Sequence, residues 1–233
     1  MSADVATPAA APRLALFDLD GTLLAGDTDV LWCEFLIEEG VLDREAFAAA
    51  NREVADRYAR GEIAAAEFAA FYAATLAGRS PAQWSSRRER FVAAKIVPRI
   101  GAASVALVSR HRGDGDRIVL TTATNRFLTA PIAALLGIVD LVATDLEVGP
   151  TGAFTGRTAG VVNMREGKVA RIADWLAGEG LGVSTLASAT FYSDSINDLP
   201  LLCAVATPIV VDPDARLKAD AMRRGWPIIS LLG

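Results

Sequence analysis

The regular alternation of short apolar runs with helical segments after Pro98 is the feature that most constrains the fold. The apolar runs predict strands at 117–121, 139–144, 188–193, 205–211 and 227–230. The segments beside them predict helices at 99–112, 127–136, 167–178, 197–203 and 213–224. Another apolar run, at 13–17, predicts a first strand. Strands that alternate with helices form a parallel sheet covered on both faces, so the sequence predicts an α/β fold.

A different pattern occupies the stretch from about Asp27 to Lys95. It is rich in Ala, Glu, Arg and aromatic residues at helical spacing, and glycines such as Gly40 and Gly61 punctuate it. The stretch contains no strand pattern. The sequence therefore predicts three or four helices inserted between the first strand and the alternating region.

Polar residues gather where predicted strands end or where a helix begins. These are the Asp18/Asp20 pair, the Thr121–Thr122 pair, Lys168, and the cluster at 194–198 (DSIND). The carboxyl ends of parallel strands meet at one edge of a sheet, and function gathers there. We therefore expect three of these groups to converge, with Lys168 reaching over from its helix start.

The two acidic clusters predict a metal site. Asp18 could offer a side-chain oxygen and Asp20 its backbone carbonyl to Mg²⁺, which leaves the Asp20 side chain free for proton transfer. Asp194 and Asp198 could complete the site. Taken singly, the first cluster could be an ordinary Asx turn, and the second could be helix capping by Ser195 or Asn197. Two dense clusters together favour the metal site.

A lysine and a hydroxyl predict a phosphoryl-binding site beside these carboxylates. Lys168 can neutralise charge and hold a nucleophilic carboxylate in place, although a lysine at a helix start is more often only solvated. Thr122 can give a hydroxyl and a backbone N–H to a phosphoryl oxygen. Thr121 is a competing choice for that role, and a strand-end or capping threonine is the alternative for both.

Composition and a few single residues indicate which partners and which cellular compartment to expect. The net charge of −5 argues against nucleic acid, because proteins that bind it carry basic patches. No uncharged apolar run approaches the ~18 residues of a membrane span, and residues 1–12 lack a signal-peptide pattern. We therefore expect a cytoplasmic protein with no membrane partner. We expect Cys33 and Cys203 to be buried thiols. We expect His111 to lie at a solvated helix end, and a single histidine excludes a multi-histidine zinc site.

Four groups of residues resemble, in order, the motifs of the haloacid dehalogenase superfamily. They are DLDGT at 18–22, Thr122, the Gly167–Lys168 pair and SDSIND at 193–198, within a match over roughly 13–212. The helical insert is similar to the small cap of the phosphoserine-phosphatase-like branch. The resemblance implies a Rossmann-like core domain at 13–24 and 97–233 with a helical cap domain at 25–96. The Ala/Pro-rich residues 1–12 predict a flexible tail.

The resemblance also implies a role for each matching residue of a Mg²⁺-dependent phosphatase. Asp18 would attack phosphorus, and Asp20 would protonate the leaving alcohol and then activate water. Thr122 and Lys168 would bind the transferring phosphoryl group. The remaining implied roles are Asp194 as a Mg²⁺ ligand, Asp198 as the residue that completes or orients that site, and Asn197 and Ser195 as support. Asn197 is also expected among the residues that bind the phosphate. Covalent catalysis of this kind splits one hard displacement into two in-line steps.

The choice of substrate depends on residues outside these motifs. An acid at Asp20 favours phosphate esters over halides, because a halide leaves without a proton. Relatives that act on phosphoserine carry a glutamate where this chain has Asp27, so an acid is kept for a substrate ammonium. Their cap also carries an arginine for the carboxylate, whereas the matching helix, at 66–73, has none. We therefore rank histidinol phosphate, an amine without a carboxylate, above phosphoserine.

Two other functions remain open at this point. A phosphotransferase or mutase would use the same motifs, and water access in the second step would decide between them. A non-catalytic phosphate-binding regulator is the alternative outside enzymes, and the filled catalytic positions argue against it. The expected partner is a small phosphorylated metabolite, and the sequence leaves the oligomeric state open.

Overall fold

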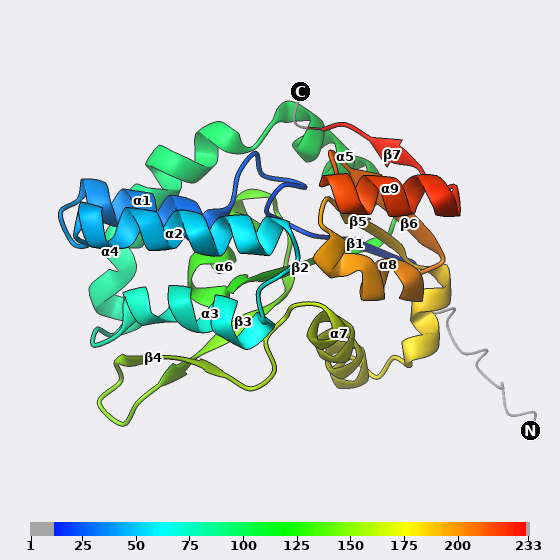
Figure 1. Ribbon diagram of the computed structural model, residues 1–233. Coiled ribbons are helices and arrows are strands. Elements are labelled where there is room, and N and C mark those ends of the chain that lie inside the picture. Colours follow the sequence, from blue (N-terminus) through cyan, green and yellow to red (C-terminus); the bar gives the residue numbers. More distant parts are fainter. Residues whose placement is uncertain (1–11, 232–233) are drawn as a thin grey trace, which may run out of the picture.

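The computed structural model describes residues 12–231 and has a seven-stranded sheet at its centre (Figure 1). Only Pro12 of the tail predicted at 1–12 falls within the described residues. The strands are β1 (Leu14–Phe17), β2 (Arg117–Asn125), β3 (Asp140–Val148), β4 (Phe154–Ala159), β5 (Thr190–Ser193), β6 (Thr207–Val211) and β7 (Ile228–Ile229). Their spatial order is β4-β3-β2-β1-β5-β6-β7. The predicted α/β class is confirmed.

The sheet is parallel except for its β4 edge, which pairs antiparallel with β3. β1 lies between β2 and β5, with Phe17 opposite Leu120 on one side and Tyr192 on the other. The chain order therefore reverses direction on either side of β1. In open α/β sheets, ligands bind beside such a switch point, at the carboxyl ends of the strands.

Helices cover both faces of the sheet. They are α5 (Ala102–Gly113), α6 (Arg126–Leu135), α7 (Glu166–Gly178), α8 (Leu199–Ala204) and α9 (Ala215–Arg224). Alternate residues of β1 face opposite ways: Ala15 and Phe17 pack in the apolar cluster that includes residues of α5 and α6, and Leu14 and Leu16 in the one that includes residues of α7, α8 and α9. Burial on both faces explains why the strands are continuous apolar runs in the sequence.

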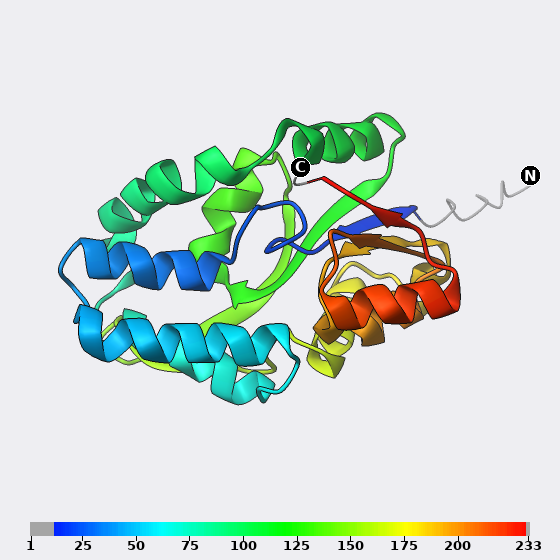
Figure 2. The same ribbon diagram turned by 45° about the horizontal axis from the view of Figure 1, so that its top comes forward.

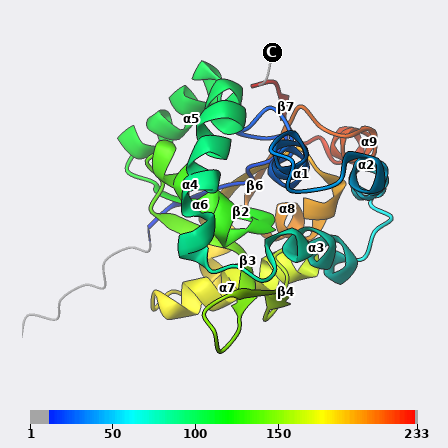
Figure 3. The same ribbon diagram turned by 90° about the vertical axis from the view of Figure 1, so that its left-hand side faces the viewer.

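The predicted helical insert forms four α-helices after β1. These are α1 (Thr28–Glu38), α2 (Arg44–Ala59), α3 (Ala65–Ala73) and α4 (Pro81–Phe91), followed by a π-helical turn at Val92–Ile96. The starts of α1 and α2 are fixed by N-cap aspartates, Asp27 and Asp43, and α4 begins with a capping box at Ser80. Figures 2 and 3 show α1 and α2 side by side. The division at residues 24/25 and 96/97 stays a prediction.

Two expectations about single residues were wrong. His111 is buried, because its ring bonds Tyr192 Oη (2.8 Å) and Asp116 Oδ2 (2.7 Å) between α5 and the sheet. Cys33 is buried as expected, but Cys203 is exposed, because α8 turns that position away from the apolar cluster that holds Leu201 and Leu202. In both cases the local sequence does not reveal which side of the helix faces the sheet.

Among residues 12–231, no single helix is both long enough and apolar enough to cross a membrane. One pair, Pro81–Arg99 with Ala102–Gly113, meets those two criteria jointly and is bent by 90°.

Candidate active site

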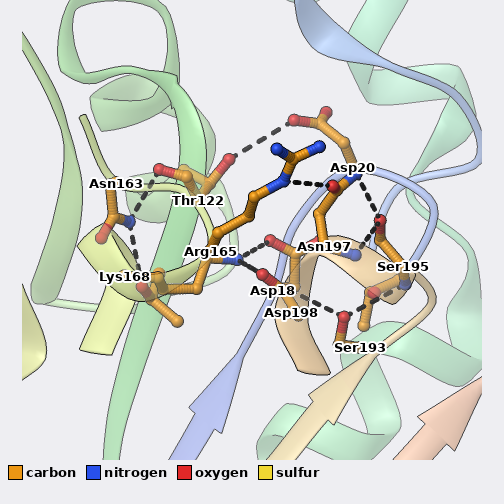
Figure 4. Close-up of polar contacts among 12 residues, drawn as sticks. Asp18, Asp20, Thr122, Asn163, Arg165, Lys168, Ser193, Ser195, Asn197 and Asp198 are labelled. Atoms are coloured by element: carbon orange, nitrogen blue, oxygen red, sulfur yellow. Dashed lines mark hydrogen bonds and ion pairs between the residues drawn. The ribbon is translucent and has the colours of Figure 1, made fainter. Parts of the chain in front are cut away.

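The predicted site residues converge at the carboxyl edge of β1, β2 and β5 (Figure 4). Asp18 and Asp20 follow β1, Thr122 lies in β2, and the 194–198 cluster follows β5. Lys168 comes from the first turn of α7 and reaches across to the same point. The expected convergence of three strand ends and one helix start is therefore what the structure has.

The loop after β1 places Asp18 and brings the acidic loop after β5 against it. The Asp18 N–H donates to the Tyr192 carbonyl (2.9 Å), which continues the sheet pairing up to the site. Gly21 has φ +74°, and a Cβ there would lie 2.1 Å from Asp194 Oδ2. Only glycine therefore permits this close approach of the two loops.

Lys168 is the buried cation of the site. Its Nζ donates to Asp18 Oδ1 (2.9 Å) and to Asp198 Oδ2 (2.7 Å), and the residue is only 2% exposed. Burial alone would lower the pKa of this ammonium, but the charges of Asp18 and Asp198 outweigh it and raise the pKa. Ser193 Oγ also donates to Asp198 Oδ2 (2.7 Å). Lys168 is therefore a fixed ammonium, and Asp198 holds it against Asp18.

Burial raises the pKa of the Asp18 carboxyl to about 7, although Lys168 acts in the opposite direction. The charges of Asp198 and Asp20 add to the rise. A carboxylate that one lysine only partly compensates would ionise more readily with a further cation beside it.

Asp20 accepts hydrogen bonds on both carboxyl oxygens. Oδ1 accepts from the N–H of Thr28 (2.8 Å) and from its hydroxyl, and Oδ2 accepts from the Thr124 hydroxyl (2.9 Å). The Thr122 hydroxyl is at 3.4 Å from Oδ2. Burial, followed by the Asp27 charge, raises the pKa of Asp20 to about 7, and the Thr28 and Thr124 bonds act against the rise. A carboxyl with a pKa near neutrality can both give and take a proton.

The structure separates the two candidate threonines. Thr121 Oγ1 accepts a hydrogen bond from Asn163 Nδ2 (3.0 Å), which also donates to the Thr122 and Val142 carbonyls. Thr122 Oγ1 accepts from the Thr124 N–H (3.2 Å) and lies beside Asp20. Thr122 is thus the one whose hydroxyl hydrogen is directed toward the carboxylates.

The remaining carboxylate, Asp194, adds a further acidic group and has no bonded cation among the described residues. It accepts a hydrogen bond from Thr22 Oγ1 (3.1 Å), and burial, with the charges of Asp18 and Asp198, raises its pKa well above the ordinary value. Hard oxygen donors with surplus charge fit a divalent cation. Within residues 12–231, no three His, Cys, Asp or Glu side chains converge on one metal position. The side chains of Asp18 and Asp194 would therefore leave room for a main-chain oxygen and water, as Mg²⁺ prefers.

A cavity of about 320 Å³ opens beside Asp20. It lies between the core loops and helix α2, and its lining residues are Asp20, Gly21, Gly26, Asp27, Ala55, Tyr58, Ala59, Asp194, Ser195 and Asp214. Four of these are acidic, and none of the described lining residues is lysine or arginine. Asp27 also caps α1 by accepting from the Val30 N–H (2.9 Å), and burial raises the pKa of its carboxyl.

Asn197 joins the core to the C-terminal end of α2. Its Nδ2 donates to the Tyr58 carbonyl (3.1 Å), and its Oδ1 accepts from Arg165 Nε (2.9 Å). Arg165 Nη2 in turn donates to the Gly61 carbonyl (2.7 Å). The amide of Asn197 is thus engaged by protein groups beside the site. Asn197 as a phosphate ligand stays a prediction.

Sequence reasoning missed several residues that complete this edge. They are Thr28, Asp29, Thr124, Asn163 and Arg165. Arg165 has a left-handed backbone, with φ 54°, which is rare for a residue with a side chain and marks a position held by its surroundings. A polar run such as Thr121–Asn125 within an apolar strand is the one signal that pointed to this group.

Two kinds of sequence comparison bear on this site. A family model of haloacid dehalogenase-like hydrolases matches residues 15–202. The histidinol-phosphatase of Neisseria meningitidis serogroup C is 37% identical over 218 residues, which cover 94% of this chain and 98% of that protein. The phosphoserine phosphatase SerB1 of Mycobacterium tuberculosis is 32% identical over 219 residues, which cover 92% of this chain and 69% of that protein.

A solved structure agrees with the fold over nearly the whole chain. The crystal structure of a protein of unknown function from Bordetella pertussis Tohama I matches with a TM-score of 0.88 and 44% identity. The match covers 94% of this chain and 99% of that one. The inserted helices are therefore shared along with the sheet.

Proposed function

The chain belongs to the haloacid dehalogenase-like hydrolase family and is a phosphatase, and we propose that it hydrolyses histidinol phosphate through a phosphorylated Asp18. The acidic cavity beside Asp20 is the observation that carries the choice of substrate. The similarity to the Neisseria histidinol-phosphatase supports the same choice.

The cavity fits a leaving alcohol that carries positive charge. Asp27 faces it from the start of α1, and Tyr58 from α2 offers an aromatic face. An ammonium gains from the carboxylate, and an imidazole can stack on the phenol ring. A substrate carboxylate would meet four aspartates and no described cation in the lining, which costs several kcal/mol for an unpaired buried charge. The lining therefore disfavours phosphoserine.

In the first step, an Asp18 carboxylate oxygen attacks phosphorus and the bond from phosphorus to the alcohol oxygen breaks. Lys168 fixes the attacking carboxylate through Oδ1 and offsets its charge. Thr122 donates its hydroxyl to the transferring phosphoryl group. Asp20 gives its proton to the departing alcohol oxygen, as a carboxyl with a pKa of about 7 can do near neutral pH.

In the second step, water attacks the phosphorus of the aspartyl phosphate. Asp20, now a carboxylate, takes a proton from that water, and the bond between phosphorus and Asp18 oxygen breaks. Inorganic phosphate leaves, and Asp18 and Asp20 return to their starting states. The threonine donors on Asp20 hold its carboxyl in one orientation through both steps.

Mg²⁺ is the cofactor that this donor set fits. We propose that the side chains of Asp18 and Asp194 and the backbone carbonyl of Asp20 hold it. When bound, it offsets the charge that keeps a carboxylate and a phosphate apart. Asp198 is bonded to Lys168 and Ser193, which favours an orienting role for it over direct ligation.

A substrate comparison tests this function. We expect kcat/KM for histidinol phosphate to exceed that for phosphoserine by at least about 100-fold, because an unpaired carboxylate costs several kcal/mol in the cavity. The measurement is phosphate release in Mg²⁺, with p-nitrophenyl phosphate as a control for intact chemistry. A preference for phosphoserine, with the control hydrolysed normally, would show that the substrate is wrong and leave the phosphatase assignment in place.

A further inference from the structure

A second buried carboxyl, Asp29, lies behind Asp20 and has no part in the mechanism above. It stands in the first turn of α1 and is 3% exposed. Its Oδ2 lies 3.1 Å from Thr124 Oγ1, and its Oδ1 accepts a long hydrogen bond from Asn125 Nδ2 (3.4 Å). Thr124 and Asn125 come from the last residues of β2. The contacts of Asp29 with Thr124 and Asn125 therefore join α1 to β2, the strand that carries Thr122.

The Thr124 hydroxyl lies between two carboxyl groups. Its oxygen is 2.9 Å from Asp20 Oδ2 and 3.1 Å from Asp29 Oδ2. A threonine hydroxyl has one hydrogen, so it can donate to only one of them. Two ionised carboxylates here would leave one close oxygen–oxygen contact without a proton between the two atoms.

A proton on Asp29 Oδ2 supplies the hydrogen that the second oxygen–oxygen contact lacks. Asp29 then donates to Thr124 Oγ1, and Thr124 donates to Asp20 Oδ2, so each oxygen–oxygen contact holds one hydrogen. Burial, with the charges of Asp27 and Asp20, raises the pKa of Asp29 well above its ordinary value, while the bonds from Thr124 and Asn125 act against it. The other ionisable neighbours, Cys33 and Tyr72, are neutral in this setting, because burial raises the pKa of each.

We propose that Asp29, as a neutral acid, is a positioning residue that turns the Thr124 hydroxyl toward Asp20 and so fixes the carboxyl that serves the leaving group. This inference rests on the proposed role of Asp20 as the general acid and base. Thr28 fixes Asp20 Oδ1 from the start of α1, and the chain from Asp29 through Thr124 fixes Oδ2. Without Asp29, the Thr124 hydroxyl is free to rotate away.

Two leaving groups separate this role from a structural one. The alcohol of histidinol phosphate needs a proton to leave, whereas p-nitrophenolate does not. Hydrolysis of the aspartyl phosphate also uses Asp20, but it is common to both esters, and kcat/KM reports only the steps that precede it. A fault in the orientation of Asp20 therefore lowers kcat/KM much more for the alkyl ester than for the aryl ester. A fault in folding or in Asp18 slows both alike. The ratio of kcat/KM for the two substrates is thus the readout.

Variants of Asp29 and Thr124 that add or remove hydrogen-bonding groups test this role. Asp29→Leu and Thr124→Val, which keep the approximate shape, should each lower kcat/KM for histidinol phosphate by at least about tenfold, and kcat/KM for p-nitrophenyl phosphate by less than about threefold. Asp29→Asn should rescue both activities to within about threefold of wild type. Its amide can donate to Thr124 and accept from Asn125, as the neutral acid does. The double variant Asp29→Leu/Thr124→Val should be no slower than Thr124→Val alone.

Each other outcome overturns the inference or its premise. Equal losses on both substrates in Asp29→Leu and Thr124→Val would make Asp29 a structural residue only. An Asp29→Asn variant as slow on the alkyl ester as Asp29→Leu would show that a charged Asp29 is needed. Asp20→Asn is the reference: if it fails to slow the alkyl ester selectively, the proposed role of Asp20 is wrong. If it does so and Thr124→Val does not, the positioning role alone falls.

Discussion

The two sides of the active site differ in how their charge is balanced. On the Lys168 side, the ammonium is bonded to Asp18 and Asp198, and Ser193 adds a further donor. On the cavity side, Asp20, Asp27, Asp194 and Asp214 line one space, and no described lining residue is a lysine or arginine. Both sides are carboxylate-rich, and among the described residues a bonded cation is found on the Lys168 side alone.

The difference indicates what each side binds. A fixed ammonium beside a carboxylate allows an anionic phosphoryl group to approach it. An acidic cavity repels a second anion and attracts a cation, whether a metal ion near Asp194 or a substrate ammonium near Asp27. The four predictions below test this division, from the largest expected effect to the smallest.

Asp18→Asn removes the nucleophile on the Lys168 side of the site. We expect it to lower kcat by at least about 10⁴-fold, because an amide oxygen cannot form the acyl phosphate, while the fold stays intact. Phosphate release on histidinol phosphate and p-nitrophenyl phosphate measures the loss, and circular dichroism checks the fold. Wild-type-like turnover would refute the assignment of Asp18.

Lys168→Met removes the one cation that bonds Asp18 and Asp198 within residues 12–231, and it keeps most of the side-chain volume. We expect kcat to fall by about 10²–10³-fold on every phosphate ester, because phosphoryl charge is no longer offset. Asp18 and Asp198 would also lose a buried partner, which costs about 3–5 kcal/mol of unfolding free energy. Lys168→Arg is the matched variant that keeps the charge. A loss confined to amine-bearing substrates would contradict the division between the two sides.

Asp27→Asn removes a charge on the acidic side and keeps the cap on α1, because asparagine caps helices as well as aspartate does. We expect KM for histidinol phosphate to rise about tenfold, and KM for p-nitrophenyl phosphate to stay within about twofold. Steady-state kinetics on both substrates provide the measurement. Equal effects on the two would remove the idea that Asp27 binds an ammonium.

The unbalanced charge should also make the metal-free protein sensitive to pH. Burial raises the pKa values of Asp18 and Asp20 from 3.8 to about 7. The folded-state pKa values lie above the unfolded-state value, so the protonated carboxyls stabilise the folded protein. That contribution to the free energy of unfolding is fully present below about pH 4 and is lost as pH rises through about 7. In EDTA, we therefore expect Tm at pH 8 to lie several degrees below that at pH 5.5.

Adding Mg²⁺ should raise Tm more at pH 8 than at pH 5.5, because the ion binds the ionised carboxylates. Asp18→Asn should flatten both dependences. A Tm in EDTA that is the same at the two pH values would mean that the carboxylates are balanced without a metal ion.

The fold class, the family and the phosphatase activity were predictable from the sequence, because they depend on patterns along the chain. Alternating apolar runs and helices specify a parallel sheet, and a parallel sheet brings its carboxyl strand ends to one edge. That rule brought Asp18, Asp20 and Asp194 together, and Lys168 reaches them from the first turn of α7. Their roles, the domain boundaries and the cytoplasmic location stay predictions.

The rest of the site depends on pairings that the local sequence does not reveal. β2 continues to Asn125, four residues beyond its predicted end, with an irregular register after Thr122. That extension brings Thr124 and Asn125 against α1, where Asp29 meets them. Arg165 and Asn163 reach the site from the segment before α7, through bonds to residues distant in the sequence.

Chemical trapping of the phosphorylated carboxyl tests the central claim most directly. The wild-type enzyme is quenched during turnover of histidinol phosphate in Mg²⁺, and borohydride reduces any acyl phosphate to the alcohol. Mass spectrometry of the peptide that contains Asp18 should then find homoserine at position 18, and Asp18→Asn should yield none. Reduction at another carboxylate, or none during demonstrated turnover, would contradict a phosphoryl group carried on Asp18.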